Sequence, residues 1–213
     1  MEINGETRIL GIIGKPIRHT MSPVIHNMIS EAQGRNMVYV PFEVENDAAA
    51  AVKGAYALGI IGMNVTVPYK TAVTESLLEI EELAERIGAV NTLVRTETGF
   101  KGYNTDISGL ERELADENVS LEGRHVLLLG AGGAARAAAF LCVKLRAASV
   151  TILNRTADKA EAIAKDVCAY AGEACSDMHT VVKAMPLNQY GTLTGSGYIA
   201  LQSTKLGMYP KTE

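Results

Sequence analysis

The feature that most constrains the fold is an apolar run followed at once by a glycine-rich turn and a helix-forming segment. His125 to Leu129 (HVLLL) is the continuous apolar run typical of a strand buried on both faces of a parallel sheet. Gly130-Ala131-Gly132-Gly133-Ala134 follows, and a helix is expected from about Ala134 to Leu145. In this context glycines permit a tight turn and let backbone N–H groups approach a pyrophosphate at the helix N-terminus. The sequence therefore predicts a dinucleotide site here, the alternative being a purely structural strand–helix turn.

The end of the next expected strand, 149–153, selects between cofactors. NAD sites usually carry an acidic residue about 20 positions after the glycines. This chain has Asn154-Arg155-Thr156 there, with Lys159 one turn into a helix expected over 156–170. A guanidinium can pair with a 2′-phosphate and stack on adenine, so these residues favour NADP over NAD. The alternative is a solvated basic turn with Thr156 as the helix N-cap.

The whole chain alternates β-rich and helical segments, which indicates an α/β fold. Other strands are expected at 8–14, 37–43, 60–67, 89–95, 99–103 and 197–202, and other helices at 22–34, 46–59, 74–87 and 106–118. Ser22 and Asn46 are the expected N-caps of the first two helices, and Gly88 is expected to end the third. The segment 166–195 matches no strong pattern beyond the end of its helix.

The expected architecture has two domains. Residues 1–106 form an α/β domain, and residues 107–213 form a Rossmann-type dinucleotide-binding domain that is incomplete.

Composition excludes several other classes. The net charge of −4 leaves no broad basic field for nucleic acid, and no apolar run is long enough to span a membrane. The three cysteines, Cys142, Cys168 and Cys175, form no CxxC pair and no disulfide framework, which favours a reduced cytoplasmic protein. His179 lies near Cys175, but no further ligand follows at a suitable spacing, so no metal site is predicted.

Polar residues gather at predicted strand ends of the first half. Asn64 and Thr66 share one strand face in the run NVTVPYK, and Lys70 stands in the turn after Pro68. The other members of this set are Thr20, Ser22, Asn91 and Asp106. Each of these residues has an ordinary reading as a turn residue, a cap or a surface charge. Together they suit a ligand with several hydroxyls and a carboxylate.

Six ordered runs give the sequence a resemblance to the shikimate dehydrogenase family. They are GKPIRHTMSPVIHN (14–27), GMNVTVPYK (62–70), GAVNTLV (88–94), GYNTDISG (102–109), GAGGAAR (130–136) and NRT (154–156), with a fainter match at 202–208. The resemblance implies an enzyme of aromatic amino acid biosynthesis, an oxidoreductase that reversibly reduces 3-dehydroshikimate to shikimate with NADPH.

The resemblance also implies roles for individual residues. Lys70 and Asp106 would form the catalytic pair, and the substrate would be bound by Thr20, Ser22, Asn64, Thr66, Lys70, Asn91 and Asp106. NADP would be bound by Gly130, Gly132, Gly133, Ala134, Asn154, Arg155, Thr156 and Lys159. The family usually has Ser-x-Ser where this chain has Thr20-x-Ser22, and often Arg where it has Lys159. A protonated Lys70 would donate to the ketone oxygen as hydride arrives, while Asp106 orients its ammonium.

Family members are expected to continue beyond Glu213 by about half a domain, on the order of 50 to 100 residues given usual domain sizes. That part would complete the nucleotide-binding sheet and supply a late Tyr, a Gly beside the nicotinamide and a Gln at the substrate. The chain is therefore expected to be truncated, which makes a homodimer through the exposed sheet edge one expectation. Two alternatives stay open: a non-catalytic fragment that binds NADP or shikimate, and a quinate/shikimate dehydrogenase that uses NAD. Asn154-Arg155-Thr156 argues against NAD, and NVTVPYK argues against a third alternative, a two-domain dehydrogenase that acts on a folate substrate.

Overall fold

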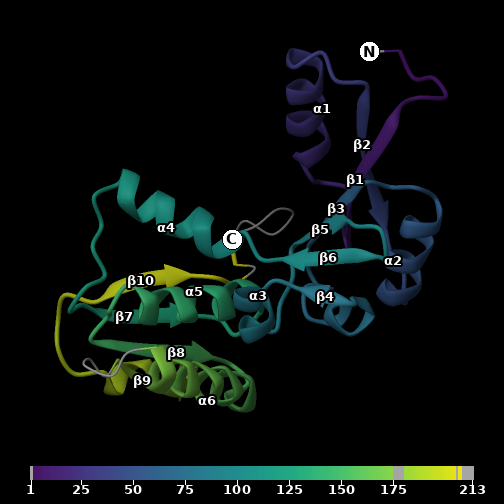
Figure 1. Ribbon diagram of the computed structural model, residues 1–213. Coiled ribbons are helices and arrows are strands. Elements are labelled where there is room, and N and C mark those ends of the chain that lie inside the picture. Colours follow the sequence, from purple (N-terminus) through teal and green to yellow (C-terminus); the bar gives the residue numbers. More distant parts are fainter. Residues whose placement is uncertain (1, 175–179, 205, 208–213) are drawn as a thin grey trace. The chain divides into compact units, whose positions relative to one another are not determined.

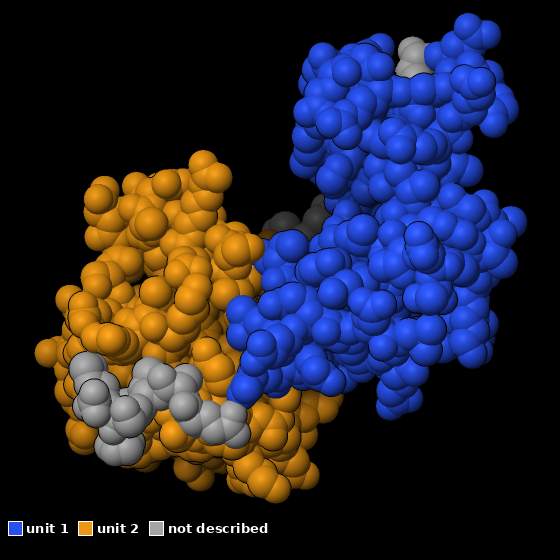
Figure 2. All heavy atoms as spheres, in the orientation of Figure 1, with its two compact units in different colours: residues 1–105 blue, residues 106–213 orange. Residues whose placement is uncertain are grey.

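The computed structural model describes residues 2–174, 180–204, 206 and 207. The chain divides into two compact units, residues 1–105 and residues 106–213 (Figure 2). Both units are of α/β type, so the fold class expected from the sequence is confirmed.

The first unit is built on a six-stranded mixed sheet in the order β2-β1-β3-β5-β6-β4. β1 pairs in parallel with β2 and β3, β5 runs antiparallel to β3 and β6, and β4 is parallel to β6. The strands are β1 (Arg8–Gly14), β2 (Met37–Glu43), β3 (Gly62–Val65), β4 (Glu79–Ile80), β5 (Thr92–Arg95) and β6 (Phe100–Tyr103). Because β1 lies between β2 and β3, the carboxyl ends of these three parallel strands meet at one edge of the sheet.

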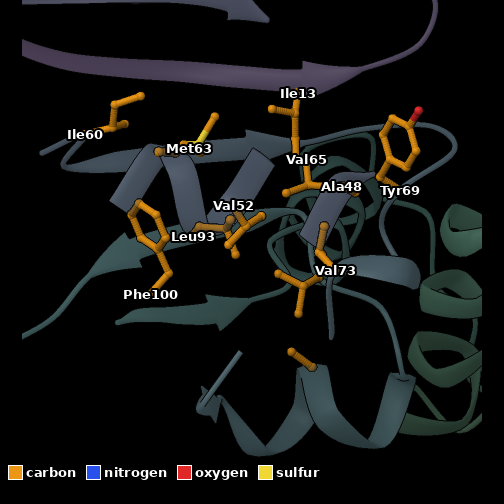
Figure 3. Packing of buried hydrophobic residues seen from close by; sticks show 13 residues of the cluster. Ile13, Ala48, Val52, Ile60, Met63, Val65, Tyr69, Val73, Leu93 and Phe100 are labelled. Atoms are coloured by element: carbon orange, nitrogen blue, oxygen red, sulfur yellow. The ribbon is translucent and has the colours of Figure 1, made fainter. Parts of the chain in front are cut away.

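Apolar side chains from the sheet and its helices form the core of this unit. α2 (Ala48–Ala57) contributes Ala48, Val52 and Ala55, which pack with sheet residues such as Val65 and Leu93 (Figure 3). α1 (Ser22–Ala32) differs from α2, because Ser30 is its sole buried residue and several large apolar side chains of its other face are exposed.

The expected helix over 74–87 was wrong over most of its length. The chain forms a 3-10 turn, η1 (Ala72–Ser76), then the short strand β4, and only then α3 (Glu82–Ile87). The physical reason is tertiary pairing: Glu81 N–H donates to Gly102 O, which joins the segment to the end of β6. The Glu81 carboxylate then caps α3 by accepting from Ala84 N–H at 3.0 Å. Gly88 ends α3 in the left-handed conformation with φ 66°, as expected.

Both expected N-caps were wrong by one residue. α1 has Met21 as its N-cap residue, and the Thr20 hydroxyl donates to the Ser22 Oγ at 3.2 Å. α2 is capped by Asp47 in place of Asn46, since the Asp47 carboxylate accepts from Ala50 N–H at 2.9 Å. In α2 the local bond from Ala50 N–H to Asp47 decides the cap, and shifts of one residue are within the usual uncertainty of helix ends.

The second unit has a four-stranded parallel sheet in the order β10-β7-β8-β9. The strands are β7 (His125–Leu129), β8 (Ser149–Asn154), β9 (Val181–Pro186) and β10 (Ile199–Gln202). α5 (Gly133–Lys144) connects β7 to β8 and packs against both α4 (Asp106–Asp116) and α6 (Ala157–Ala174) (Figure 1). β9 and the 3-10 turn η2 (Leu187–Thr192) correct the expectation of irregular structure over 166–195. β9 lacks a strong sequence signal because its six residues include a lysine and a proline.

Among the described residues, no helix is long and apolar enough to cross a membrane, and no three His, Cys, Asp or Glu side chains gather into a metal site. Cys142 is buried and Cys168 is exposed, both as free thiols. Cys175, His179, Lys205 and Met208, which the sequence analysis considered, lie outside the described residues.

Candidate functional site

Asn91 is the most buried member of the polar set in the first unit. It immediately precedes β5, and the residue is 8% exposed. Its Oδ1 accepts from Thr105 N–H at 3.0 Å and from Thr92 Oγ1 at 2.9 Å, and its Nδ2 donates to Thr105 Oγ1 at 3.1 Å. These bonds fix the amide and place Thr105 beside it, fourteen residues along the chain. A buried polar group with this many partners has a single well-defined orientation.

Asn64 lies next to Asn91 on the neighbouring strand. In the β3–β5 register Asn64 stands opposite Thr92, and its Nδ2 donates to Thr92 Oγ1 at 3.3 Å and to Asn91 O at 3.4 Å. The structure thus brings together Asn64 and Asn91, two residues that the sequence placed in one site.

Tyr39 is a member of this cluster that the sequence analysis missed. Its hydroxyl donates to Asn64 Oδ1 at 2.6 Å. Burial raises the pKa of Tyr39 from its ordinary value of 10.0 to about 12, against a smaller opposing effect from a hydrogen bond with Ser22. The hydroxyl therefore keeps its proton across the physiological range. The signal in the sequence was Tyr39 itself, the single hydroxyl among the apolar first four residues of MVYVPFE. The sequence pattern indicated only an ordinary strand there.

Thr20 and Ser22 form a pair of hydroxyls at the start of α1. Besides the bond between the two hydroxyls, Ser22 N–H donates to Thr20 Oγ1 at 3.3 Å. Ser22 also lies near the Tyr39 hydroxyl, whose pKa it lowers slightly against the effect of burial. Thr20 and Ser22 thus lie beside the residue that bonds to Asn64.

Thr66 and Lys70 lie on the segment that follows β3. Thr66 N–H donates to Ile13 O at 2.9 Å, and Gly14 lies so close to Thr66 that an added Cβ would overlap with the Thr66 Cγ2. The Lys70 carbonyl accepts from Val90 N–H at 2.7 Å, which ties this segment to the residue before Asn91. The Lys70 side chain is partly buried.

Asp106 is the first residue of α4 and of the second unit. It is partly buried and directly follows Thr105, whose backbone and hydroxyl both bond to Asn91. Its pairing with Lys70 stays a prediction.

The glycine turn of the second unit is set by the backbone. Gly130 has φ +114°, a conformation that side chains rarely adopt, and its N–H donates to Leu153 O at 2.8 Å. Ser203, which follows β10, donates from N–H and Oγ to Leu129 O at 2.9 and 2.7 Å. Three adjacent strands therefore fix the entry to the turn.

The start of α5 is open in the way a phosphate site requires. Gly132 is its N-cap residue, and no side chain caps the helix there. A Cβ on Gly132 would meet no atom within 4 Å, so the packing of the described residues does not require glycine at this position. Open space at an uncapped helix N-terminus suits the close approach of a pyrophosphate, and the residues present fit a dinucleotide.

The end of β8 carries the residues expected to select NADP. Because β7 and β8 are adjacent and parallel, Asn154 and the glycine turn lie at the same edge of the sheet. Arg155, Thr156 and Lys159 are exposed, while the Asn154 Nδ2 donates to Thr156 O at 2.9 Å and so braces the turn itself. Asp158, an exposed carboxylate in the first turn of α6, stands beside Lys159 and was not considered in the sequence analysis.

Comparisons with known proteins place both units in one family. The family model described as "Shikimate dehydrogenase substrate binding domain" matches residues 12–93, and the model "Shikimate / quinate 5-dehydrogenase" matches residues 113–188. An NADP(+) shikimate dehydrogenase of Methanothermobacter thermautotrophicus is 42% identical over 213 residues, covering 99% of this chain and 72% of the relative. One of Carboxydothermus hydrogenoformans is 41% identical, with the same two shares.

Solved structures agree with these relatives. A crystal structure of shikimate dehydrogenase in complex with NADP+ superposes with a TM-score of 0.83 at 37% identity, covering 98% of this chain and 70% of that one. Quinate dehydrogenase from Corynebacterium glutamicum in complex with NAD has a TM-score of 0.82 at 28% identity, with shares of 95% and 72%. The ordered motifs, the fold of both units and relatives above 40% identity along nearly the whole sequence establish that this chain belongs to the shikimate dehydrogenase family.

Proposed function

We propose that this chain catalyses the reversible NADPH-dependent reduction of 3-dehydroshikimate to shikimate. The observation that carries the proposal is a group of polar side chains in the first unit: hydrogen bonds join Asn64 to Asn91 and to Tyr39, and the bonded pair Thr20 and Ser22 lies near Tyr39. Hydroxyl and amide groups held in fixed orientations match a small ring that carries several hydroxyls and a carboxylate. The names of the relatives, NADP-dependent shikimate dehydrogenases, support the same substrate.

The proposed substrate ligands are Thr20, Ser22, Asn64, Thr66, Lys70, Asn91 and Asp106. Thr20 and Ser22 are preorganised by their bonds to each other, Asn64 and Asn91 by the bonds of their cluster, and Thr66 is fixed through its backbone. Fixed groups lose little conformational entropy on binding, so the substrate gains more from each contact. The domain roles follow from these assignments: the first unit, with a boundary near 106, would bind substrate, and the second would bind NADP.

Lys70 is the proposed general acid. As negative charge develops on the ketone oxygen, its ammonium would donate a proton to that oxygen, and in the oxidation direction the amine would take the proton back. Asp106 would orient the ammonium and accept from a substrate hydroxyl. When NADPH is bound, its nicotinamide supplies the hydride.

The second unit would hold the cofactor mostly through backbone groups. The amides following Gly130 and Gly132, with Gly133 and Ala134, would bind the pyrophosphate. Arg155, Thr156 and Lys159 would bind the 2′-phosphate, on a turn that Asn154 braces. The exposed carboxylate of Asp158 would lie beside these cations, so its removal should strengthen 2′-phosphate binding slightly.

The test is shikimate oxidation by the purified 213-residue chain, followed through the absorbance of NADPH. NAD in place of NADP, and quinate in place of shikimate, test the NAD-linked quinate alternative. Turnover confined to NADP and shikimate would support the proposal, whereas faster turnover with NAD and quinate would favour the alternative.

Binding without turnover defines the remaining alternative, a non-catalytic fragment. Calorimetric titration with NADPH and with shikimate separates it from an inactive or misfolded preparation, which would bind neither. A homodimer and a cytoplasmic location stay predictions from the sequence; light scattering of the purified chain tests the first.

A further inference from the structure

Tyr39 is held from two sides by consecutive residues of α1. β2 is an edge strand, so its outward backbone groups lack a neighbouring strand. Asn27 supplies both missing partners: Tyr39 N–H donates to Asn27 Oδ1 at 2.8 Å, and Asn27 Nδ2 donates to Tyr39 O at 3.0 Å. His26 stacks its ring on the Tyr39 ring, with centroids 4.3 Å apart and an interplanar angle of 9°. Backbone and ring of Tyr39 are therefore both fixed by α1.

The Tyr39 hydroxyl in turn holds the oxygen end of the Asn64 amide, whose orientation Asn91 O sets. One end of that amide faces Asn91 O, a carbonyl that can only accept, so the Asn64 NH₂ group must point there. The Asn64 oxygen then faces Tyr39, which must donate its single hydroxyl proton. An amide in the reverse orientation would place two acceptors together at Asn91 and leave the Tyr39 proton without an acceptor at Asn64.

We infer that Asn27 is a positioning residue for the substrate site: it acts through Tyr39 to hold the Asn64 amide in place. Asn27 itself lies in α1, outside the set of proposed substrate ligands, and its side chain bonds to the backbone of the edge strand. The inference rests on the proposed function, because Asn64 matters to catalysis only if it binds the substrate. Without Asn27, Tyr39 gains freedom, its bond to Asn64 weakens, and the Asn64 side chain is held from one side only.

The experiment is a double-mutant cycle with Asn27→Ala and Tyr39→Phe, with KM for shikimate, kcat and the Kd for NADPH measured in each variant. Each single substitution should raise KM about tenfold, the effect of losing one well-formed hydrogen bond, with a smaller change in kcat and none in the NADPH Kd. The double variant should be no worse than the worse single variant, since both act through one hydroxyl. Multiplicative effects on KM, or an equal rise in the NADPH Kd, would overturn the inference.

Two further variants separate positioning from a general loosening of the unit. Asn27→Asp keeps the acceptor for Tyr39 N–H but sets a carboxylate oxygen against Tyr39 O, and it should raise KM at least as much as Asn27→Ala does. Tyr56→Phe removes another hydroxyl, which lies away from the cluster and donates to Glu97 O at 2.7 Å. This substitution should leave KM unchanged. A rise in KM with Tyr56→Phe as large as with Tyr39→Phe would also overturn the inference.

A measurement that needs no turnover distinguishes this inference from the proposed function. The side-chain amide resonances of Asn64, assigned by their loss in Asn64→Ser, should shift or broaden in Asn27→Ala and Tyr39→Phe but not in Tyr56→Phe. Unchanged resonances would overturn the positioning role even in an active enzyme. If the wild-type chain neither binds nor oxidises shikimate, the proposed function fails, while these resonances still decide whether Asn27 fixes Asn64.

Discussion

The two units prepare their proposed ligand sites by different means. In the first unit, the site residues are fixed by hydrogen bonds among themselves: direct, partly buried bonds join Asn64, Asn91, Tyr39 and Thr105. In the second, the backbone is fixed by neighbouring strands around Gly130, while the charged side chains, Arg155 and Lys159, are exposed. A ligand recognised by its pattern of hydroxyls needs fixed side chains, whereas a pyrophosphate needs only N–H groups that the fold already points outward.

This difference predicts that substitutions in the first unit change substrate kinetics, and that substitutions in the second change cofactor affinity alone. Four experiments test the contrast, and they follow in order of decreasing expected effect.

The largest effect is expected for Lys70→Ala. Removing the proposed general acid should lower kcat by roughly a hundredfold or more, the usual contribution of acid–base catalysis. The Kd for NADPH, measured by fluorescence titration, should stay within experimental error. Lys53→Ala, which removes an exposed lysine of α2, is the matched control and should leave kcat unchanged. A comparable loss of NADPH affinity in Lys70→Ala would contradict the assignment of Lys70 to the substrate side.

The second effect concerns Arg155→Ala. Loss of a charge-assisted hydrogen bond to the 2′-phosphate should raise the Kd for NADPH about ten- to a hundredfold and leave the Kd for NADH nearly unchanged. Calorimetry with both nucleotides measures the ratio. Lys165→Ala serves as the control, because it removes an exposed cation that lies in α6 and not in the turn before it. An equal rise in the Kd values for NADH and NADPH would mean that Arg155 supports the turn and does not bind the 2′-phosphate.

The third effect concerns Gly14→Ala, which disturbs the first site through packing. The new methyl would overlap with Thr66 Cγ2 and lie 3.2 Å from Val67 O, so the segment carrying Thr66 must shift. Overpacking of this kind costs roughly 1–3 kcal/mol of unfolding free energy, measurable by urea denaturation, and KM for shikimate should rise with it.

Gly54→Ala is the control for Gly14→Ala, because a Cβ there meets no atom within 4 Å in the middle of α2. It should stabilise the chain slightly through helix propensity. If Gly14→Ala is as stable as Gly54→Ala and keeps its KM, the close approach of Gly14 to Thr66 has no role in the site.

The smallest effect is a pH dependence that Tyr39 should impose. The pKa of Tyr39 is raised by burial from 10.0 to about 12 in the folded chain. Between these values the unfolded chain releases this proton while the folded chain keeps it, so the free energy of unfolding should fall as pH rises through this window. Below about pH 10 the contribution is complete and constant. The difference in unfolding free energy between wild type and Tyr39→Phe, measured by urea denaturation, should therefore shrink above pH 10; parallel curves would contradict the buried, protonated hydroxyl.

Local sequence signals predicted the second unit well where the periodicity was strong. The run HVLLL forms β7, and the predicted helix after the glycine turn is α5. Both elements have boundaries correct to one residue. The start of α6 was likewise correct to one residue, at Ala157. β9 could not be predicted, because a short parallel strand with Lys183 and Pro186 is specified by its neighbour β8 and not by its own composition.

In the first unit the sequence predicted the polar residues but not the partner that holds them. Asn64 and Asn91 were identified from their places at strand ends, whereas Tyr39 and Asn27 were read as ordinary strand and helix residues. Their roles depend on two contacts. α1 lies against the edge strand β2, and the Tyr39 side chain of β2 extends past β1 to Asn64 of β3. The spacing of residues within one segment does not encode a contact between two distant segments, so the sequence pattern could not predict it.

The sequence by itself determined the fold class, the glycine turn at the start of α5, the basic residues at the end of β8 and the members of the polar set, because each follows from local periodicity or residue chemistry. Only the tertiary structure decided that residues 74–80 form no α-helix and that the Tyr39 hydroxyl bonds to Asn64. These outcomes depend on contacts between segments far apart in the chain, where hydrogen bonds and burial across strands outweigh the weaker preferences of local sequence.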